Sequence, residues 1–127
     1  MYSAAVLERV RNPLRVGEFP EGGQDVGTGQ AGTLHEGTTA RIQVRAEAGR
    51  IVEARFKVFG CSAAIAAAGL VAEWLEGATL EEGRHITPAR VVEALALPAE
   101  RPHVARVAVD AAHRAVDDVT EKAGKRP

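Results

Sequence analysis

Apolar and polar side chains alternate one for one in two adjacent stretches of the chain, residues 40–47 and residues 50–59. The turn signal Ala48-Gly49 separates the two stretches. Alternation with a period of two residues is typical of a strand that buries one face. The sequence therefore predicts a β-hairpin whose polar face is exposed to water and whose apolar face packs against helices.

Helical periodicity occupies the two ends of the chain and the stretch that follows the hairpin. Ser3 is a suitable cap for the first helix, and the dipeptide Thr87-Pro88 is a suitable start for a later one. After Gly60 the period changes from two to about 3.6 residues, which predicts a largely apolar helix. The predicted helices are Ser3–Val10, Ser62 to the closing Gly77, Ala89–Leu95 and Val104–Val119, with a frayed tail over residues 124–127.

The region between the first helix and the hairpin is rich in glycine. It holds seven glycines from Gly17 to Gly37 and few large apolar side chains. We expect a long loop there with at most one short strand, and unstructured loops longer than about 12 residues tend to be functional or disordered. The chain as a whole predicts a single α+β domain over residues 1–127, a small antiparallel sheet packed on one face by helices.

Composition narrows the class of protein. The formal net charge is −1 and the basic residues are scattered among acidic ones, so nothing argues for a nucleic-acid partner. The longest nearly apolar run, residues 63–72, is far shorter than the roughly 20 residues that cross a bilayer. The single cysteine excludes an internal disulfide, and the amino terminus lacks a secretory signal pattern. We therefore expect a cytoplasmic protein without a membrane segment.

Cys61 lies where the second strand of the hairpin is expected to end and the next helix to begin. The free N–H groups in the first turn of a helix favour a thiolate, and Gly60 leaves the sulfur approachable. A lone free cysteine is more often a small buried side chain than a reactive group. Its placement at this junction nevertheless favours a ligand or a nucleophile.

Other polar residues have simpler interpretations. His113 and Asp117 are four residues apart in the last predicted helix, which favours a solvated face with a local charge pair over a ligand pair. His85 precedes a helix cap and is expected in a surface loop. The pair Gly27-x-Gly29 lacks the strand-to-helix context of a dinucleotide site.

The stretch from Phe56 to Glu82 begins FKVFGCSAAI and resembles the central segment of the U-type iron–sulfur cluster assembly scaffolds, IscU and the amino-terminal domain of NifU. Residues Asn12–Gly17 are similar to the N-P-x-x-x-G segment of that family, and Val26–Gly29 to its glycine-rich loop. The likeness extends over nearly the whole chain. It implies the α+β fold of the family, a scaffold role without catalysis, and assembly partners such as a cysteine desulfurase.

The resemblance also implies a metal site, from which this chain departs. The family builds its site from three cysteines and an aspartate, with a histidine beside the third cysteine. At the positions of the three cysteines this sequence has Glu36, Cys61 and Val104, so only the second cysteine is present. Thr38 stands at the position of the aspartate. The histidine is retained as His103. One thiolate of three therefore remains.

The donors left by this comparison are Cys61, His103 and either His35 or Glu36. A [2Fe–2S] cluster normally takes four protein donors, whereas three donors suit a single tetrahedral ion such as zinc with an open position. A cluster that is bound between the two chains of a homodimer is a further alternative. We predict a scaffold-like protein with a degenerate site centred on Cys61, which holds an iron–sulfur cluster, a single zinc or iron ion, or nothing.

Alternative functions need no cluster. One is a paralogue that acts through protein contacts, as an interaction or regulatory protein. Another is a thiol enzyme in which His103 or His35 serves Cys61 as a base, although no orienting Asn or Asp is evident. Transfer of sulfur from a persulfide donor to Cys61 is a weaker hypothesis, because the resemblance assigns the sulfur-accepting cysteine to the position of Val104. In the family, the segment that corresponds to Leu97–Arg101 implies recognition by an Hsp70-type chaperone. Its sequence is altered here, so whether such a chaperone recognises this chain stays an open question.

Overall fold

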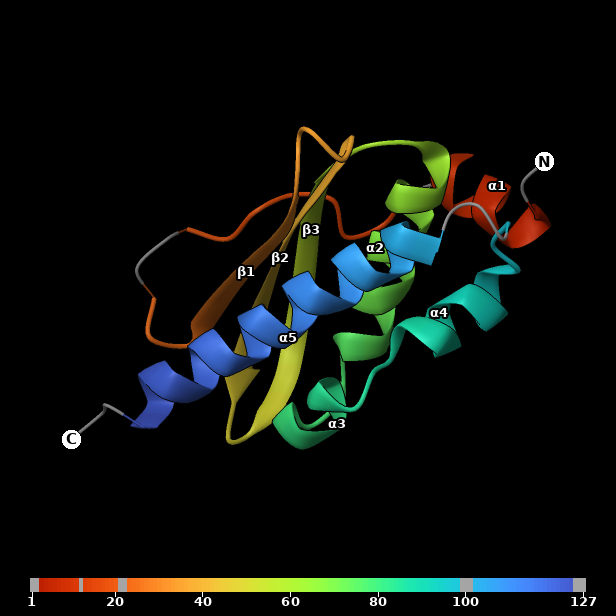
Figure 1. Ribbon diagram of the computed structural model, residues 1–127. Helices are drawn as coiled ribbons and strands as arrows, with labels where there is room; N and C mark the ends of the chain where they lie inside the picture. Colours follow the sequence, from red (N-terminus) through yellow and green to blue (C-terminus); the bar gives the residue numbers. More distant parts are fainter. Residues whose placement is uncertain (1–2, 12, 21–22, 99–101, 125–127) are drawn as a thin grey trace.

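The computed structural model describes residues 3–11, 13–20, 23–98 and 102–124 (Figure 1). Within these residues, β1 (Val26–Thr33), β2 (Thr38–Glu47) and β3 (Arg50–Phe59) form an antiparallel sheet in the order β1-β2-β3. The helices are α1 (Ala4–Arg11), α2 (Ser62–Leu75), α3 (Leu80–Arg84), α4 (Pro88–Leu95) and α5 (Pro102–Gly124). The predicted α+β class is therefore confirmed.

The predicted hairpin is formed by β2 and β3. Val44 pairs with Ala54 across the two strands, and both side chains are fully buried against the helices. The turn residues Ala48 and Gly49 have φ values of 51° and 79°, the left-handed conformation that two-residue hairpin turns require. Alternation thus identified the turn and most of the buried face, but the pairing register shifts between Arg45 and Ala46, so that Ile51 is fully buried while Val52 is only half-buried.

Part of the predicted glycine-rich loop is a strand. β1 pairs with β2 along its whole length, from Val26 opposite Arg45 to Thr33 opposite Thr38. A Cβ atom built on Gly27 would lie 2.1 Å from the carbonyl oxygen of Ala115, and α5 approaches Gly29 equally closely. These glycines allow the backbone of α5 to lie directly on β1, so their spacing reflects packing.

Side chains of α5 also cover the outer edge of β1. Asp118 accepts a hydrogen bond from the Thr28 N–H at 2.9 Å, and Lys122 donates to the Val26 carbonyl at 2.8 Å. Arg114 donates to the carbonyl of Gln30. Because these groups occupy hydrogen-bonding positions that an edge strand leaves open, β1 is protected against pairing with another chain.

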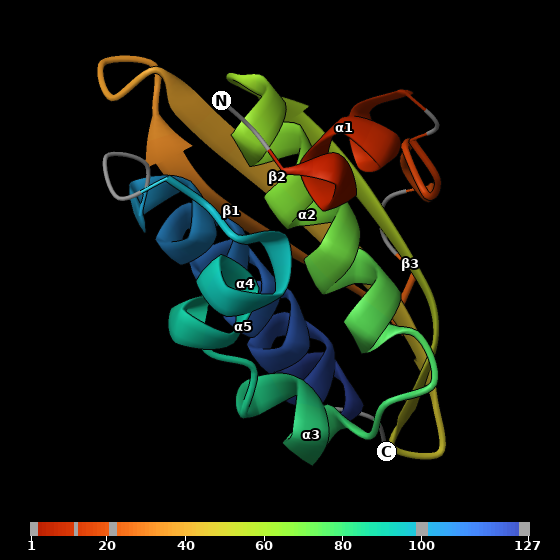
Figure 2. The ribbon, with the colours of Figure 1, turned by 90° about the vertical axis from the view of Figure 1, so that its right-hand side faces the viewer.

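The helices lie on one face of the sheet, as predicted (Figure 2). α5 packs on β1 and β2, α2 packs on β3, α1 packs against α2, and α4 packs against both α2 and α5. The predicted cap Ser3 accepts a hydrogen bond from the Val6 N–H at 3.3 Å. Within the described residues, no helix is both long enough and apolar enough to cross a membrane.

Helix α3 was not predicted, although its signal is present in the sequence. Thr79 accepts a hydrogen bond from the Glu82 N–H, and the Glu82 carboxylate accepts one from the Thr79 N–H. This reciprocal pair is a capping box, which a threonine followed three residues later by glutamate indicates. The predicted fraying of residues 124–127 falls outside the described residues, apart from Gly124 at the end of α5.

The outer face of the sheet is less exposed than the alternation predicted. Val16 forms a parallel bridge with Phe56 at the edge of β3. The following segment crosses the outer face, where the Phe19 N–H donates to the side-chain oxygen of Gln43 at 2.8 Å. The Gln43 amide donates in turn to Thr28 at 3.0 Å and is only 1% exposed. A polar residue of the outer face is therefore buried by a crossing segment.

Candidate functional site

Cys61 lies at the junction of β3 and α2, where the sequence placed it. It is the N-cap residue of α2, with extended backbone angles of φ −77° and ψ 175°. Its carbonyl oxygen accepts hydrogen bonds from the N–H groups of Ala64 and Ile65, and its side chain makes no capping bond. The thiol is partly buried beside the core. Its sulfur is therefore not used for capping.

The turn between β1 and β2 carries His35 and Glu36, both exposed. Thr33 organises this turn, because its hydroxyl accepts a bond from the Glu36 N–H at 3.1 Å and donates to the Glu36 carboxylate at 3.2 Å. Gly37 has a φ of 79°, which favours glycine. A Cβ atom built on Gly60 would lie 3.4 Å from the Gly37 carbonyl oxygen. The turn is therefore a direct neighbour of the Cys61 junction.

The beginning of α5 approaches the same turn. Arg106 donates to the carboxylate of Glu36 at 3.0 Å and to that of Asp110 at 3.4 Å. His103, one turn of helix before Arg106, is partly buried. Figure 2 shows the β1–β2 turn, the start of α2 and the start of α5 at one end of the molecule. The structure thus gathers the elements that carry the predicted ligands.

The predicted ligands are not assembled into a metal site. Among the described residues, no group of three or more His, Cys, Asp or Glu side chains is arranged to hold a metal ion. The carboxylate of Glu36 is bonded to Thr33 and Arg106. The ligand set of Cys61, His103 and either His35 or Glu36 consequently stays a prediction, and it would need a movement of the turn or of a side chain.

Two residues that the resemblance sets at donor positions of the family site lie in the protein interior. Thr38, which stands at the position of the aspartate, is 3% exposed, and its hydroxyl oxygen lies 3.3 Å from a Cβ atom built on Gly60. Val104, at the position of the third cysteine, is 1% exposed and belongs to the hydrophobic core. If the resemblance assigns these positions correctly, neither residue offers a donor to a metal ion, because Val104 is apolar and Thr38 is buried.

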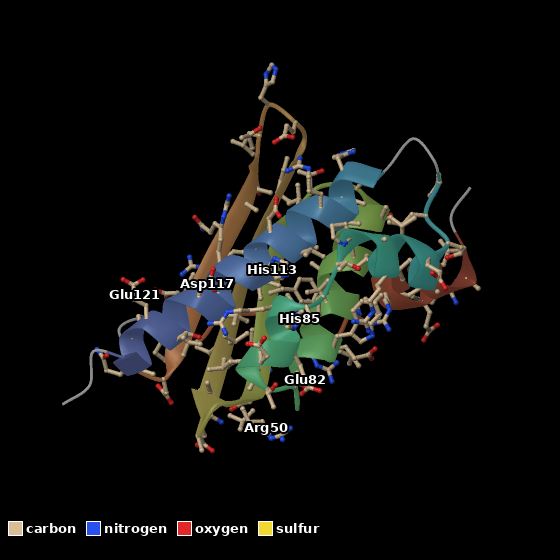
Figure 3. The ribbon with its side chains drawn as sticks, turned by 60° about the horizontal axis from the view of Figure 1, so that its bottom comes forward. Arg50, Glu82, His85, His113, Asp117 and Glu121 are labelled. Atoms are coloured by element: carbon tan, nitrogen blue, oxygen red, sulfur yellow. The ribbon has the colours of Figure 1, made fainter. Side chains whose placement is uncertain are left out.

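The remaining histidines have structural roles (Figure 3). The Nε2 atom of His113 lies 2.9 Å from the Ile86 carbonyl oxygen, and the side chain is partly buried. The predicted solvated charge pair of His113 with Asp117 is therefore wrong, because Asp117 accepts a bond from Arg84 at 3.2 Å. His85 is exposed at the end of α3, where its Nδ1 atom lies 2.8 Å from a backbone carbonyl.

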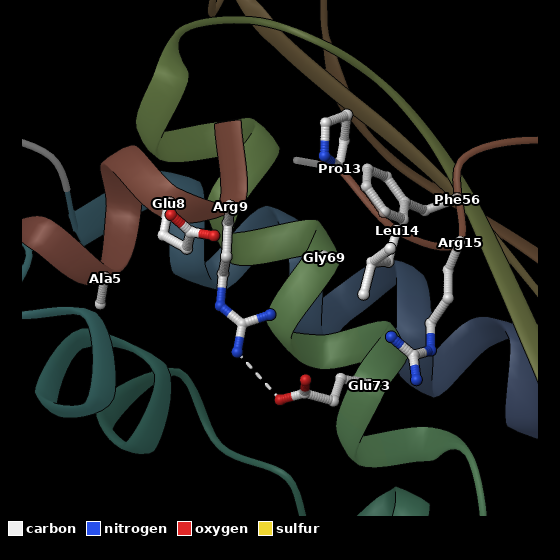
Figure 4. Close-up of a pocket in the computed structure, with 9 residues that line it drawn as sticks. All are labelled: Ala5, Glu8, Arg9, Pro13, Leu14, Arg15, Phe56, Gly69 and Glu73. Atoms are coloured by element: carbon white, nitrogen blue, oxygen red, sulfur yellow. Dashed lines mark hydrogen bonds and ion pairs between the residues drawn. The ribbon is translucent and has the colours of Figure 1, made fainter. Parts of the chain in front are cut away.

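A cavity of about 320 Å³ lies between α1, residues 13–15 and α2, away from the Cys61 junction (Figure 4). Arg9 and Glu73 form an ion pair across it at 2.9 Å, and the side chains of Leu14 and Phe56 contribute apolar surface. Its lining contains neither cysteine nor histidine. It is therefore separate from the site that the sequence predicts.

Sequence comparison agrees with this architecture. Residues 1–126 match the pattern of the NifU-like N-terminal domain. The chain belongs to this family. Over 124 residues it is 40% identical to the iron–sulfur cluster assembly scaffold protein IscU of Azotobacter vinelandii, with 97% of each chain covered. Over 122 residues it is 36% identical to the IscU scaffold of Escherichia coli strain K12, with 95% of each covered.

A solved structure has the same fold. The crystal structure of the N-terminal part of a nitrogen-fixing NifU-like protein from Brucella abortus aligns with a TM-score of 0.72 over 94% of each chain, at 20% identity. This likeness concerns the fold alone. The sequence matches confirm the family resemblance that the motif around Cys61 indicated.

Arg106 is the site residue that the sequence interpretation missed. Two signals were available, namely its position three residues after His103 and its spacing of four residues from Asp110, a favourable pairing on a helix. Neither signal identifies Glu36 as a partner. That contact depends on how the β1–β2 turn meets α5.

Proposed function

We propose that this chain works in iron–sulfur cluster assembly as a scaffold-family protein with a degenerate site. We further propose that Cys61 is the thiolate ligand of the cargo, which is an iron–sulfur cluster or a metal ion. One observation carries the proposal: the single cysteine, Cys61, lies at the β3–α2 junction of a chain that is 40% identical to an IscU scaffold. The cluster is cargo in this role, so we expect no catalysed reaction.

The proposed donors are Cys61, His103 as a nitrogen ligand, and His35 or Glu36 from the β1–β2 turn. Three donors are fewer than the four that a [2Fe–2S] cluster normally takes, although histidine is an accepted replacement for cysteine in some clusters. A cluster would therefore need a donor from another molecule. Two chains of a homodimer would supply two thiolates, and a single zinc or iron ion is the alternative occupant.

Apolar surface at the end of the sheet near the β1–β2 turn supports a protein partner. Leu34 is 73% exposed and Phe59 is 61% exposed, and both line a hollow of about 500 Å³ at the end of the sheet that carries the β1–β2 turn. Exposed large apolar side chains that gather around a hollow are typical of an interaction surface. We propose that an iron–sulfur assembly protein such as a cysteine desulfurase docks here, in the cytoplasm.

Anaerobic reconstitution with ferrous iron and sulfide tests the function. We expect the wild type to retain iron and acid-labile sulfide after desalting, Cys61→Ala to lose both, and His103→Ala to retain less. His85→Ala is the matched control, because this exposed histidine lies outside the site, and it should behave as the wild type. If the wild type retains neither element, or if Cys61→Ala retains as much as the wild type, the proposed role is wrong.

Zinc binding separates the alternative occupant from the cluster. A site for a single ion predicts retention of about one zinc per chain without sulfide, lost in Cys61→Ala. A paralogue without a cargo predicts no retention of zinc, iron or sulfide, while binding to a cysteine desulfurase persists.

A further inference from the structure

The Glu36 carboxylate uses both of its oxygen atoms within the protein. Its Oε1 atom accepts a hydrogen bond from the Thr33 hydroxyl at 3.2 Å, and its Oε2 atom accepts one from the Arg106 guanidinium at 3.0 Å. These two bonds leave lone pairs on the carboxylate, but the guanidinium already gives Glu36 a cationic partner within the protein. A metal ion that used Glu36 would compete with Arg106 for this carboxylate.

Arg106 is oriented for this contact by its own helix. Its second guanidinium nitrogen donates to Asp110 at 3.4 Å, one turn further along α5. This bond limits the side-chain freedom that forming the pair with Glu36 would otherwise remove. The ion pair joins residues that are 70 positions apart in the sequence, so it connects the β1–β2 turn to α5.

Packing beneath the ion pair brings the same two elements together. A Cβ atom built on Gly32, at the base of the turn, would lie 3.1 Å from a methyl carbon of Val107 on α5. Thr38, at the other side of the turn, is 3% exposed, and Val104 on α5 is 1% exposed. The turn therefore packs on α5 at Gly32 as well as through the ion pair.

We propose that the Glu36–Arg106 ion pair fixes the β1–β2 turn on α5 in the absence of metal, and that Glu36 serves this link and not metal ligation. The proposal goes beyond the scaffold role and does not depend on it. It also narrows the predicted ligand set. His35, and not Glu36, becomes the residue of the β1–β2 turn that would bind a cluster or metal ion together with Cys61.

Amide hydrogen exchange, measured by NMR in metal-free protein with EDTA, tests the link. The Gly37 N–H, bonded to the Leu34 carbonyl at 3.0 Å, is the reporter. Both side chains of the ion pair are well exposed, at 48% and 39%, so we expect Arg106→Gln to speed exchange at Gly37 by about two- to fivefold. Glu36→Gln should have the same effect, and the double variant should add nothing further.

Two controls keep the result specific. Arg84→Gln removes another arginine contact to α5, the one with Asp117, and should leave exchange at Gly37 unchanged. Raising the NaCl concentration to about 1 M screens an exposed pair. It should therefore bring the wild type to the exchange rate of Arg106→Gln and leave that variant unchanged.

The opposite outcomes overturn the proposal. If Arg106→Gln exchanges at the wild-type rate, the ion pair does not hold the turn. If Zn²⁺ slows exchange at Gly37 in the wild type and this slowing disappears in Glu36→Gln, then Glu36 is a metal ligand. The EDTA measurements are informative even if the reconstitution experiment fails, so the two proposals can fail separately.

Discussion

Glu76 links three parts of the fold through one carboxylate. It ends α2 and accepts hydrogen bonds from the Ala54 N–H at the edge of β3, at 2.9 Å, and from Arg15, at 2.7 Å. Burial raises the pKa of Glu76, but the bond from Ala54 and the guanidinium groups of Arg15 and Arg55 lower it by more, so the pKa lies below its ordinary value. The ionised form therefore stabilises the folded chain.

The effect of pH on Glu76 follows from the direction of this shift. A carboxyl group whose folded pKa is lowered stabilises the fold above its unfolded pKa, about 4.3 for glutamate, and loses this contribution as the pH falls through the folded pKa. We expect Glu76→Gln to lower the free energy of unfolding at pH 7 by about 1–3 kcal/mol. The difference from the wild type should shrink below about pH 4.3. Urea unfolding at a series of pH values measures it.

Glu73→Gln is the control for this prediction. Glu73 pairs only on the surface with Arg9, and its side chain is 43% exposed, so we expect a change of at most about 1 kcal/mol. An equal loss in the two variants, or a difference for Glu76→Gln that does not vary with pH, would contradict the role given to Glu76.

Individual residue roles were predictable only where they depend on local sequence. The position of Cys61 at a helix start and the cap at Ser3 follow from their neighbours in the chain. The bond of His113 to the Ile86 carbonyl and the pairing of Glu36 with Arg106 join distant segments. Spacing along one helix could not show these contacts, which is why His113 was assigned to a solvated face.

At the scale of elements, the packing of α5 on β1 depends on glycine. A Cβ atom on Gly29 would lie 2.1 Å from the Ala111 carbonyl oxygen and 2.4 Å from the Ala115 backbone nitrogen. Backbone atoms cannot move aside as a flexible side chain can. The helix and the strand would have to separate to admit a methyl group.

We therefore expect Gly29→Ala to lower the free energy of unfolding by about 3 kcal/mol, at the upper end of the usual cost of overpacking. Gly69→Ala is the matched control. A Cβ atom at Gly69 in α2 would lie 3.6 Å from the Phe56 ring, an ordinary contact, and alanine favours the helix by about 0.5–1 kcal/mol. Chemical unfolding of both variants measures the difference. Equal stabilities would refute the packing argument.

This packing explains which elements the sequence could predict. β2 and β3 have regular alternation because one face of each is covered by helix side chains. β1 has small residues where α5 lies closest, so it lacks that alternation, and a glycine-rich loop was the natural interpretation. The segment that crosses the outer face was also hidden, because nothing local to Gln43 indicates that Phe19 will cover it.

At the scale of the whole molecule, one thiolate per chain limits what a single copy can hold. Two copies would offer two Cys61 thiolates and two His103 nitrogens, which together match the four donors that a [2Fe–2S] cluster takes. We expect reconstituted protein to contain about one iron and one sulfide per chain and to sediment as a dimer. Analytical ultracentrifugation with iron analysis measures both quantities. Two irons per monomer would contradict a shared cluster.

We propose that Cys61 is the thiolate that binds the cluster or metal ion. Mass spectrometry after a timed iodoacetamide pulse tests it directly, because the chain has one cysteine and each modification therefore reports on Cys61. The claim predicts rapid alkylation of the apoprotein, protection after reconstitution with iron and sulfide, and renewed alkylation after chelation of the iron. Equal alkylation rates in the reconstituted protein and the apoprotein would contradict it.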